Sequence, residues 1–94
     1  MNRYYVYIAS NKHRTVFFIG VTNDIKRRIA EHKELRGSAF CKRYNITDLV
    51  YFEMCNDIQQ AIAREKNLKN WHREWKLNLI NSVYPEMKDL YFEL

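Results

Sequence analysis

The chain has 94 residues, 47% of them hydrophobic and 29% charged, and carries a net charge of +5. This length and composition indicate one small folded domain over residues 1–94 and exclude an intrinsically disordered chain. No run of about 18 apolar residues is present and the N-terminus lacks a signal-peptide core, so we expect a cytoplasmic protein with no membrane partner. Two cysteines, Cys41 and Cys55, are too few for a disulfide framework, and we expect reduced thiols.

Two strands joined as an antiparallel hairpin are predicted at the start of the chain. Residues 4–9 alternate, which puts Val6 on one face and Tyr7 on the other. Residues 15–19 are a second run of β-branched and aromatic side chains, and a polar, turn-like segment separates the two runs. Gly20 is expected to end the second strand.

A helix capped by Thr22 or Asn23 is predicted to follow, reaching about residue 35 before Gly37 breaks it. Two polar side chains share the face of its buried isoleucines. With about 100° per residue, Arg28 and His32 both lie within about 60° of the first of those isoleucines. This helix is therefore expected to point a cation and an imidazole inward.

The second half of the chain predicts one strand and a long helical stretch. The expected elements are a helical turn at 40–44, a strand at 48–53 and helix from residue 56 or 57 to about 82. Because so long a helix is unusual, we expect two helices that meet near residues 71–75, and Pro85 should end the second and leave a short irregular tail. The predicted fold class is α+β, a small three-stranded, mainly antiparallel sheet flanked by helices in the order β-β-α-(α)-β-α-α.

A charge occupies a core-like position in the helix that begins near residue 57. Its apolar stripe contains Ile58, Ala61, Ile62 and Leu68, and Glu65 lies about 20° from Ile58 on the helical wheel. A carboxylate is rarely buried without a partner or a task. If both helices pack on one sheet, Glu65 could meet Arg28 and His32 and form a site.

Two aromatic triplets carry a resemblance to a known family. Tyr5-Val6-Tyr7 and Phe18-Ile19-Gly20 have their key aromatic residues, Tyr7 and Phe18, eleven positions apart. Together with Arg28, His32 and Glu65, in this order, they resemble the GIY-YIG nuclease family. The similarity is greatest to its small stand-alone members and to the catalytic domain of repair excision nucleases, and it covers nearly the whole chain.

The resemblance implies a divalent-metal-dependent endonuclease that hydrolyses DNA phosphodiester bonds, weakly or at particular DNA structures. It places Tyr7, Phe18, Arg28, His32 and Glu65 in the catalytic site. Glu65 would hold a single Mg²⁺ or Mn²⁺ ion, and Arg28 would grip the phosphate. Tyr7, assisted by His32, would accept the proton of the attacking water.

Basic residues gather in two stretches, 26–43 and 64–76, with aromatic side chains nearby. This pattern favours a nucleic-acid partner, expected to be DNA. The side chains assigned to nucleic-acid binding are Lys26, Arg27, Lys33, Arg36, Lys42, Arg43, Lys69 and Arg73. A solvated, charged helix face explains the charges alone equally well.

Alternatives remain open at this point. Phe18 lacks the hydroxyl of the family's usual tyrosine, and Tyr84 stands where stand-alone members commonly have an asparagine before a proline, which favours a catalytically impaired nucleic-acid-binding module of the same fold. A protein-interaction domain that uses the Trp71 and Trp75 region and the acidic tail is the third hypothesis. Arg28 and Glu65 could also form only a buried ion pair between two helices.

Overall fold

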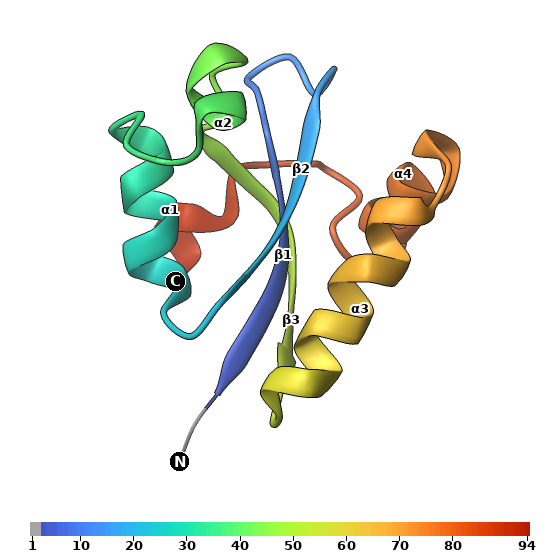
Figure 1. Cartoon of the computed structure of the whole chain (residues 1–94). Coiled ribbons are helices and arrows are strands. Elements are labelled where there is room, and N and C mark those ends of the chain that lie inside the picture. The colour runs from blue at the N-terminus through green and yellow to red at the C-terminus, as the bar shows by residue number, and fades with distance from the viewer. Residues whose placement is uncertain (1–2) are drawn as a thin grey trace.

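A three-stranded antiparallel sheet lies at the centre of the computed structural model, which describes residues 3–94 (Figure 1). Its strands are β1 (Tyr4–Ser10), β2 (Phe17–Thr22) and β3 (Asp48–Cys55), in the order β2-β1-β3. β1 is thus the central strand and the other two are edges. The fold class predicted from the sequence is confirmed, and the sheet is antiparallel throughout.

Helices cover both faces of the sheet (Figure 1). On one side lie α1 (Ile25–Lys33) and the short α2 (Ala39–Arg43); on the other lie α3 (Ile58–Asn70) and α4 (Arg73–Val83). The predicted break in the long helical stretch is confirmed, because the backbone leaves the helix between α3 and α4. Within residues 3–94, no helix has the length and apolar character that crossing a bilayer requires.

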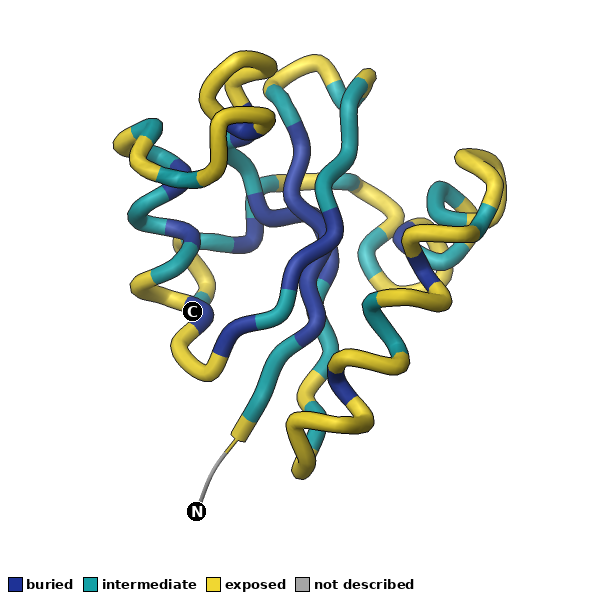
Figure 2. The backbone as a smooth tube through the Cα atoms, in the orientation of Figure 1, coloured by how far each residue is buried: buried dark blue, intermediate teal, exposed yellow. Residues whose placement is uncertain are grey.

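Both faces of β1 are buried, as the alternation along residues 4–9 predicts. Val6 and Ile8 pack in a cluster with side chains of α3 and α4, and Tyr7 and Ala9 pack in a second cluster with side chains of α1 and α2. Figure 2 shows the buried residues following the central strand. The sheet therefore separates two small cores, which explains why every residue from Val6 to Ser10 is buried.

The boundaries around β2 and α1 correct two expectations. Gly20 does not end the second strand, since it pairs with Tyr7 and the ladder continues to Thr22. The N-cap of α1 is Asp24, whose side chain accepts a hydrogen bond from the Arg27 backbone. Thr22, one of the predicted caps, instead accepts a bond from the Asp24 backbone and so fixes the turn that enters the helix.

The tail after α4 is more ordered than the sequence predicts. It ends in a 3₁₀ helix, η1 (Leu90–Glu93), with Leu90 buried in the core on the α1 side. Asp89 ties this segment to the rest of the fold, because its carboxylate accepts bonds from the backbone of Leu49 and from the ammonium of Lys33. The acidic tail is therefore part of the packing beside β3.

The cysteines are both free, as expected. Cys41 is the buried residue of α2, and Cys55 is half-buried at the end of β3. Burial raises the pKa of both thiols, which makes the reactive thiolate scarce.

Candidate active site

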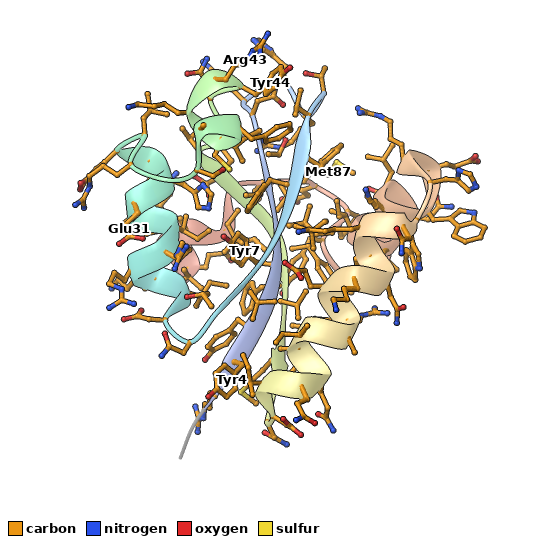
Figure 3. The ribbon with its side chains drawn as sticks, in the orientation of Figure 1. Tyr4, Tyr7, Glu31, Arg43, Tyr44 and Met87 are labelled. Carbon is orange, nitrogen blue, oxygen red and sulfur yellow. The ribbon has the colours of Figure 1, made fainter. Side chains whose placement is uncertain are left out.

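A buried hydrogen bond joins the central strand to the first helix. β1 directs Tyr7 toward α1, and α1 directs His32 back toward the sheet, so that the Tyr7 hydroxyl lies 3.0 Å from Nε2 of His32. The two rings meet edge to face, and both residues are buried. The helical-wheel prediction that His32 faces inward is confirmed, and Figure 3 shows Tyr7 between the sheet and α1.

Burial holds both groups in their uncharged forms. It raises the pKa of the Tyr7 hydroxyl far above its usual range, an effect that the nearby Arg28 guanidinium partly opposes. Burial, and then the Arg28 charge, lower the pKa of His32 below its ordinary value of 6.5. At neutral pH a protonated phenol therefore faces a neutral imidazole, which is able to accept its proton at Nε2.

Gly20 makes room for the phenol ring. It pairs with Tyr7 across the ladder, and a Cβ added at Gly20 would lie 2.5 Å from Cζ and from the hydroxyl oxygen of Tyr7. No side chain fits at that distance, so the absence of a Cβ at Gly20 allows Tyr7 to reach His32. The sequence analysis predicted only that Gly20 ends a strand and did not find this role. The position of Gly20 in the second triplet was the signal that could have indicated it.

Phe18 belongs to the same aromatic cluster. Its ring centroid lies 6.3 Å from that of Tyr7 and 5.7 Å from that of His32. A tyrosine at this position would bring a second hydroxyl to the cluster. Phe18 contributes only an apolar ring.

Arg28 lies beside the Tyr7–His32 pair, one turn earlier on α1. Its side chain is 42% exposed, and its Nε atom is 3.4 Å from Glu31 of the same helix. That Nε is buried and makes no hydrogen bond with any residue that the structure describes. The guanidinium is thus held next to the pair by packing and a long ion pair, with enough exposure to reach a ligand in solvent.

Glu65 approaches from the opposite face of the sheet. Its side chain on α3 is 21% exposed and pairs with Lys69 at 3.2 Å. Its charge raises the pKa of the Tyr7 hydroxyl, as that of Glu31 does, so Glu65 acts electrostatically on the phenol although α1 and α3 flank different faces (Figure 1). The carboxylate is half-buried with a solvent-facing partner.

The helical wheel of α3 was only partly right. Ala61 and Leu68 are buried, but Ile58 and Ile62 are exposed, because α3 touches the sheet along a narrower line than the apolar stripe suggests. The alternative of a buried Arg28–Glu65 ion pair is wrong. Each of the two side chains pairs within its own helix, and the sheet lies between these helices.

Glu65 is the carboxylate that the sequence assigns to a metal ion. Within residues 3–94, no group of three or more histidine, cysteine, aspartate or glutamate side chains could enclose an ion. Mg²⁺ retains most of its water and is often bound through one or two carboxylates, so Glu65 fits a hydrated Mg²⁺ or Mn²⁺ ion. The same donor set does not fit zinc, which takes three or four protein ligands.

The basic residues assigned to nucleic-acid binding divide into two groups. Among residues 3–94, those whose exposed side chains bond no backbone atom are Lys26, Arg27, Arg36, Lys42, Arg43 and Lys69. Arg36 pairs with Glu34 and Lys69 with Glu65. Lys33 instead bonds the Thr47 carbonyl and Asp89, and Arg73 bonds the backbone of Thr15 in the β1–β2 loop. Lys33 and Arg73 therefore hold neighbouring segments of the fold together.

Tyr84 packs on β3, where one of its partners, Phe52, is the cross-strand neighbour of Tyr7. Its ring stacks on Phe52 and meets Tyr51 edge to face, and both partners belong to β3. Its neighbours are thus on the strand opposite β2, the strand that carries Phe18 and Gly20. The substitution at this position affects the packing around the C-terminal tail.

A sequence comparison identifies the family. The family described as "GIY-YIG catalytic domain" matches residues 3–78. The chain belongs to the GIY-YIG family. The resemblance found in the two triplets is thereby confirmed, and membership places the chain in a nuclease superfamily whose members generally depend on divalent metal ions and act on nucleic acid.

Relatives of similar length support this assignment. The chain is 34% identical over 82 residues to UPF0213 protein SH2523 of Staphylococcus haemolyticus, a match that covers 87% of this chain and 99% of that protein. The solution NMR structure of UPF0213 protein BH0048 from Bacillus halodurans is similar in fold, with a TM-score of 0.55 and 26% identity. That similarity covers 86% of this chain and 85% of the other. The chain therefore resembles small, stand-alone GIY-YIG proteins.

Proposed function

We propose that this chain is a divalent-metal-dependent endonuclease that hydrolyses phosphodiester bonds in DNA. The observation that carries the proposal is the buried hydrogen bond between Tyr7 and His32, in a chain of the GIY-YIG family. A phenol sequestered against a neutral imidazole is costly to build for stability alone, because both polar groups must be desolvated. The arrangement suits a proton-transfer pair.

The proton path runs from water to Tyr7 and then to His32. Tyr7 takes the proton of the attacking water as its own proton passes to Nε2 of His32, 3.0 Å away. The water oxygen bonds to phosphorus, the P–O bond to the leaving sugar oxygen breaks, and that oxygen takes a proton from solvent. Ionising Tyr7 without help is unfavourable, because burial raises the pKa of its hydroxyl. The adjacent Arg28 charge opposes that rise and favours the phenolate.

The remaining groups bind the phosphate and the ion. Arg28 is partly exposed and can donate two parallel hydrogen bonds to phosphate oxygens, which a lysine cannot do. Glu65 would hold a single Mg²⁺ or Mn²⁺ ion, which when bound neutralises phosphate charge and eases ionisation of water. The exposed basic side chains near α1 and α2 would neutralise flanking phosphates.

Cleavage assays with two glutamate variants test the proposal. Purified protein is incubated with duplex, nicked and branched DNA in the presence of Mg²⁺ or Mn²⁺, and products are resolved on denaturing gels. Wild type and Glu74→Ala should cleave, since Glu74 is an exposed residue of α4. Glu65→Ala should not. Equal cleavage by Glu65→Ala would reject the assignment of the carboxylate and point to a contaminating nuclease.

A second candidate is a nucleic-acid-binding module with impaired catalysis. The absence of a hydroxyl on Phe18, whose ring contacts both Tyr7 and His32, favours it. This candidate predicts DNA binding that weakens steeply with salt, because neutralised phosphates release counterions, without cleavage under any metal condition. Turnover that depends on Glu65 would exclude it.

A further inference from the structure

Aromatic rings form a continuous row from the Tyr7–His32 pair to solvent. Phe18 contacts His32, the Phe40 centroid lies 6.3 Å from Phe18, and the Tyr44 centroid lies 4.8 Å from Phe40. Phe40 is 45% exposed and Tyr44 is 39% exposed. Isolated exposed apolar residues are common on proteins. A continuous row of rings that runs from a buried polar pair to the solvent-exposed surface instead indicates a binding site.

The fold of α2 holds the outer two rings on the surface. Phe40 and Tyr44 are four residues apart, which aligns them on one side of the helical turn. Cys41 is the buried residue of α2, and Ser38 caps the helix through the Cys41 backbone. Asn45 follows with a φ of 55°, and the Ile46 backbone bonds back to the Cys41 carbonyl, which ends the turn. The rings are thus fixed before any ligand arrives.

Positive charge surrounds these rings. Residues 36–44 contain Arg36, Lys42 and Arg43 and no acidic residue. The Arg43 guanidinium lies 5.5 Å from the centre of the Tyr44 ring. Figure 3 shows Arg43 and Tyr44 together at one end of the molecule. Exposed rings among cations are the surface on which single-stranded nucleic acids stack their bases while their phosphates are neutralised.

We infer that Phe40 and Tyr44 form a stacking platform for unpaired nucleobases, so that the strand bound at the site is single-stranded next to the scissile phosphate. The inference rests on the proposed function for the position of that phosphate. Bases in an intact duplex are already stacked on their neighbours and cannot lie on these rings. The platform therefore selects nucleic acids with unpaired nucleotides over uninterrupted duplex.

Binding without metal tests the platform separately from cleavage. Fluorescence anisotropy in EDTA measures the affinity of a labelled oligodeoxynucleotide, of its duplex, and of a strand with the same phosphates but abasic at its central positions. Wild type should bind the intact single strand more tightly than the other two. Phe40→Ala and Tyr44→Ala should each weaken single-strand binding about tenfold and leave duplex and abasic binding nearly unchanged.

Two further variants serve as controls. Trp75→Ala removes an aromatic side chain that is 55% exposed and lies among basic residues of α4, and should leave single-strand affinity unchanged. Phe40→Trp keeps a ring at the platform, should retain affinity, and should lose its fluorescence when a base stacks on it. Thermal unfolding identifies any variant that fails to fold. If an alanine variant fails, the fluorescence of Phe40→Trp decides instead: quenching by the intact strand but not by the abasic strand supports the platform, and no quenching by either overturns it.

Several outcomes decide the question. Equal affinity of wild type for the intact and abasic strands would overturn the platform, as would equal losses for single strand and duplex in Phe40→Ala. An oligoribonucleotide of the same sequence tests whether the unpaired bases belong to DNA or to RNA. Loss of affinity in the platform variants for either nucleic acid supports the inference. A failed cleavage assay with intact platform behaviour would remove the proposed endonuclease and leave the base-stacking site.

Discussion

Gly20 faces Tyr7 across the β1–β2 ladder so closely that a Cβ on Gly20 would lie 2.5 Å from the Tyr7 hydroxyl oxygen. Because Tyr7 is buried, its ring has no space into which it could swing. The hydrogen bond to His32 thus depends on a residue that has no side chain. This relationship links a small backbone detail to the proposed chemistry.

We expect Gly20→Ala to displace the Tyr7 ring and to destabilise the fold by about 1–3 kcal/mol, as overpacked cores do. Urea unfolding measures the stability, and the His32 ring signals in an NMR spectrum report the lost contact. Gly37→Ala is the matched control, because a Cβ there would meet His32 and Cys41 at ordinary distances of 3.4 Å or more. Equal losses in both variants would show that the short approach at Gly20 is unimportant.

Tyr7→Phe separates chemistry from packing. The variant keeps the ring but leaves Nε2 of His32 buried without its partner, so the stability should fall by about 1–3 kcal/mol. Cleavage should fall at least about a hundredfold, since the proton acceptor is lost. Tyr5→Phe on the same strand is the control, because the Tyr5 ring packs on Phe52. Cleavage by Tyr7→Phe at the wild-type rate would contradict the proposed proton path.

The buried His32 should make stability depend on pH. Its pKa in the folded chain lies below the ordinary value of 6.5, so the unfolded chain binds more protons as the pH falls through 6.5. The contribution of the neutral ring to stability is complete above that pH and decreases below it, down to the lowered pKa. Urea unfolding from about pH 7.5 to about pH 5 should show a steeper loss for wild type than for His32→Gln. Parallel curves for the two proteins would contradict the buried, neutral assignment.

Binding of a metal ion should appear as a stability gain. Adding Mg²⁺ or Mn²⁺ should raise the melting temperature of the wild type, because a ligand that binds only the folded state stabilises it by mass action. Glu65→Gln should abolish this gain while changing the metal-free stability little, since the Glu65–Lys69 pair is worth only about 0.3–0.5 kcal/mol. A full metal response in Glu65→Gln would place the ion elsewhere.

Restoring the family's tyrosine at position 18 should raise cleavage. Phe18→Tyr adds a hydroxyl beside Tyr7 and His32 without changing the ring. Tyr84→Asn should behave differently, lowering stability through loss of the stack on Phe52 and leaving cleavage per folded molecule unchanged. Steady-state cleavage together with urea unfolding distinguishes the two effects. An unchanged rate in Phe18→Tyr would show that the missing hydroxyl does not limit turnover.

Alternation in β1 was readable from the sequence because a strand sends successive side chains to opposite faces whatever covers them. That rule placed Tyr7 and Val6 correctly in different cores. The helical wheel of α1 likewise predicted correctly that His32 faces the core. The wheel of α3 failed for Ile58 and Ile62, because an angle on a helix does not say which of two neighbouring apolar faces touches the sheet.

The end of α1 shows a second limit of sequence reasoning. Gly37 was expected to break the helix, yet the left-handed residue that ends it is Leu35, with a φ of 57°. The Leu35 and Arg36 amides bond back to His32 and Glu31, forming a Schellman motif. A left-handed leucine costs about 1–2 kcal/mol, and only the tertiary fold, in which the side chain is half-buried, can offset that cost.

The arrangement of the two helix layers also sets an order of assembly. Tyr7, Arg28 and His32 all precede β3 in the chain, whereas Glu65 belongs to α3 on the far side of the sheet. Because the ribosome delivers the N-terminal half first, the proton-transfer pair leaves the exit tunnel before the carboxylate proposed to hold the metal. A half-made or truncated polypeptide would carry no ion at this site. On the proposed mechanism, an unfinished chain would therefore not cleave nucleic acid.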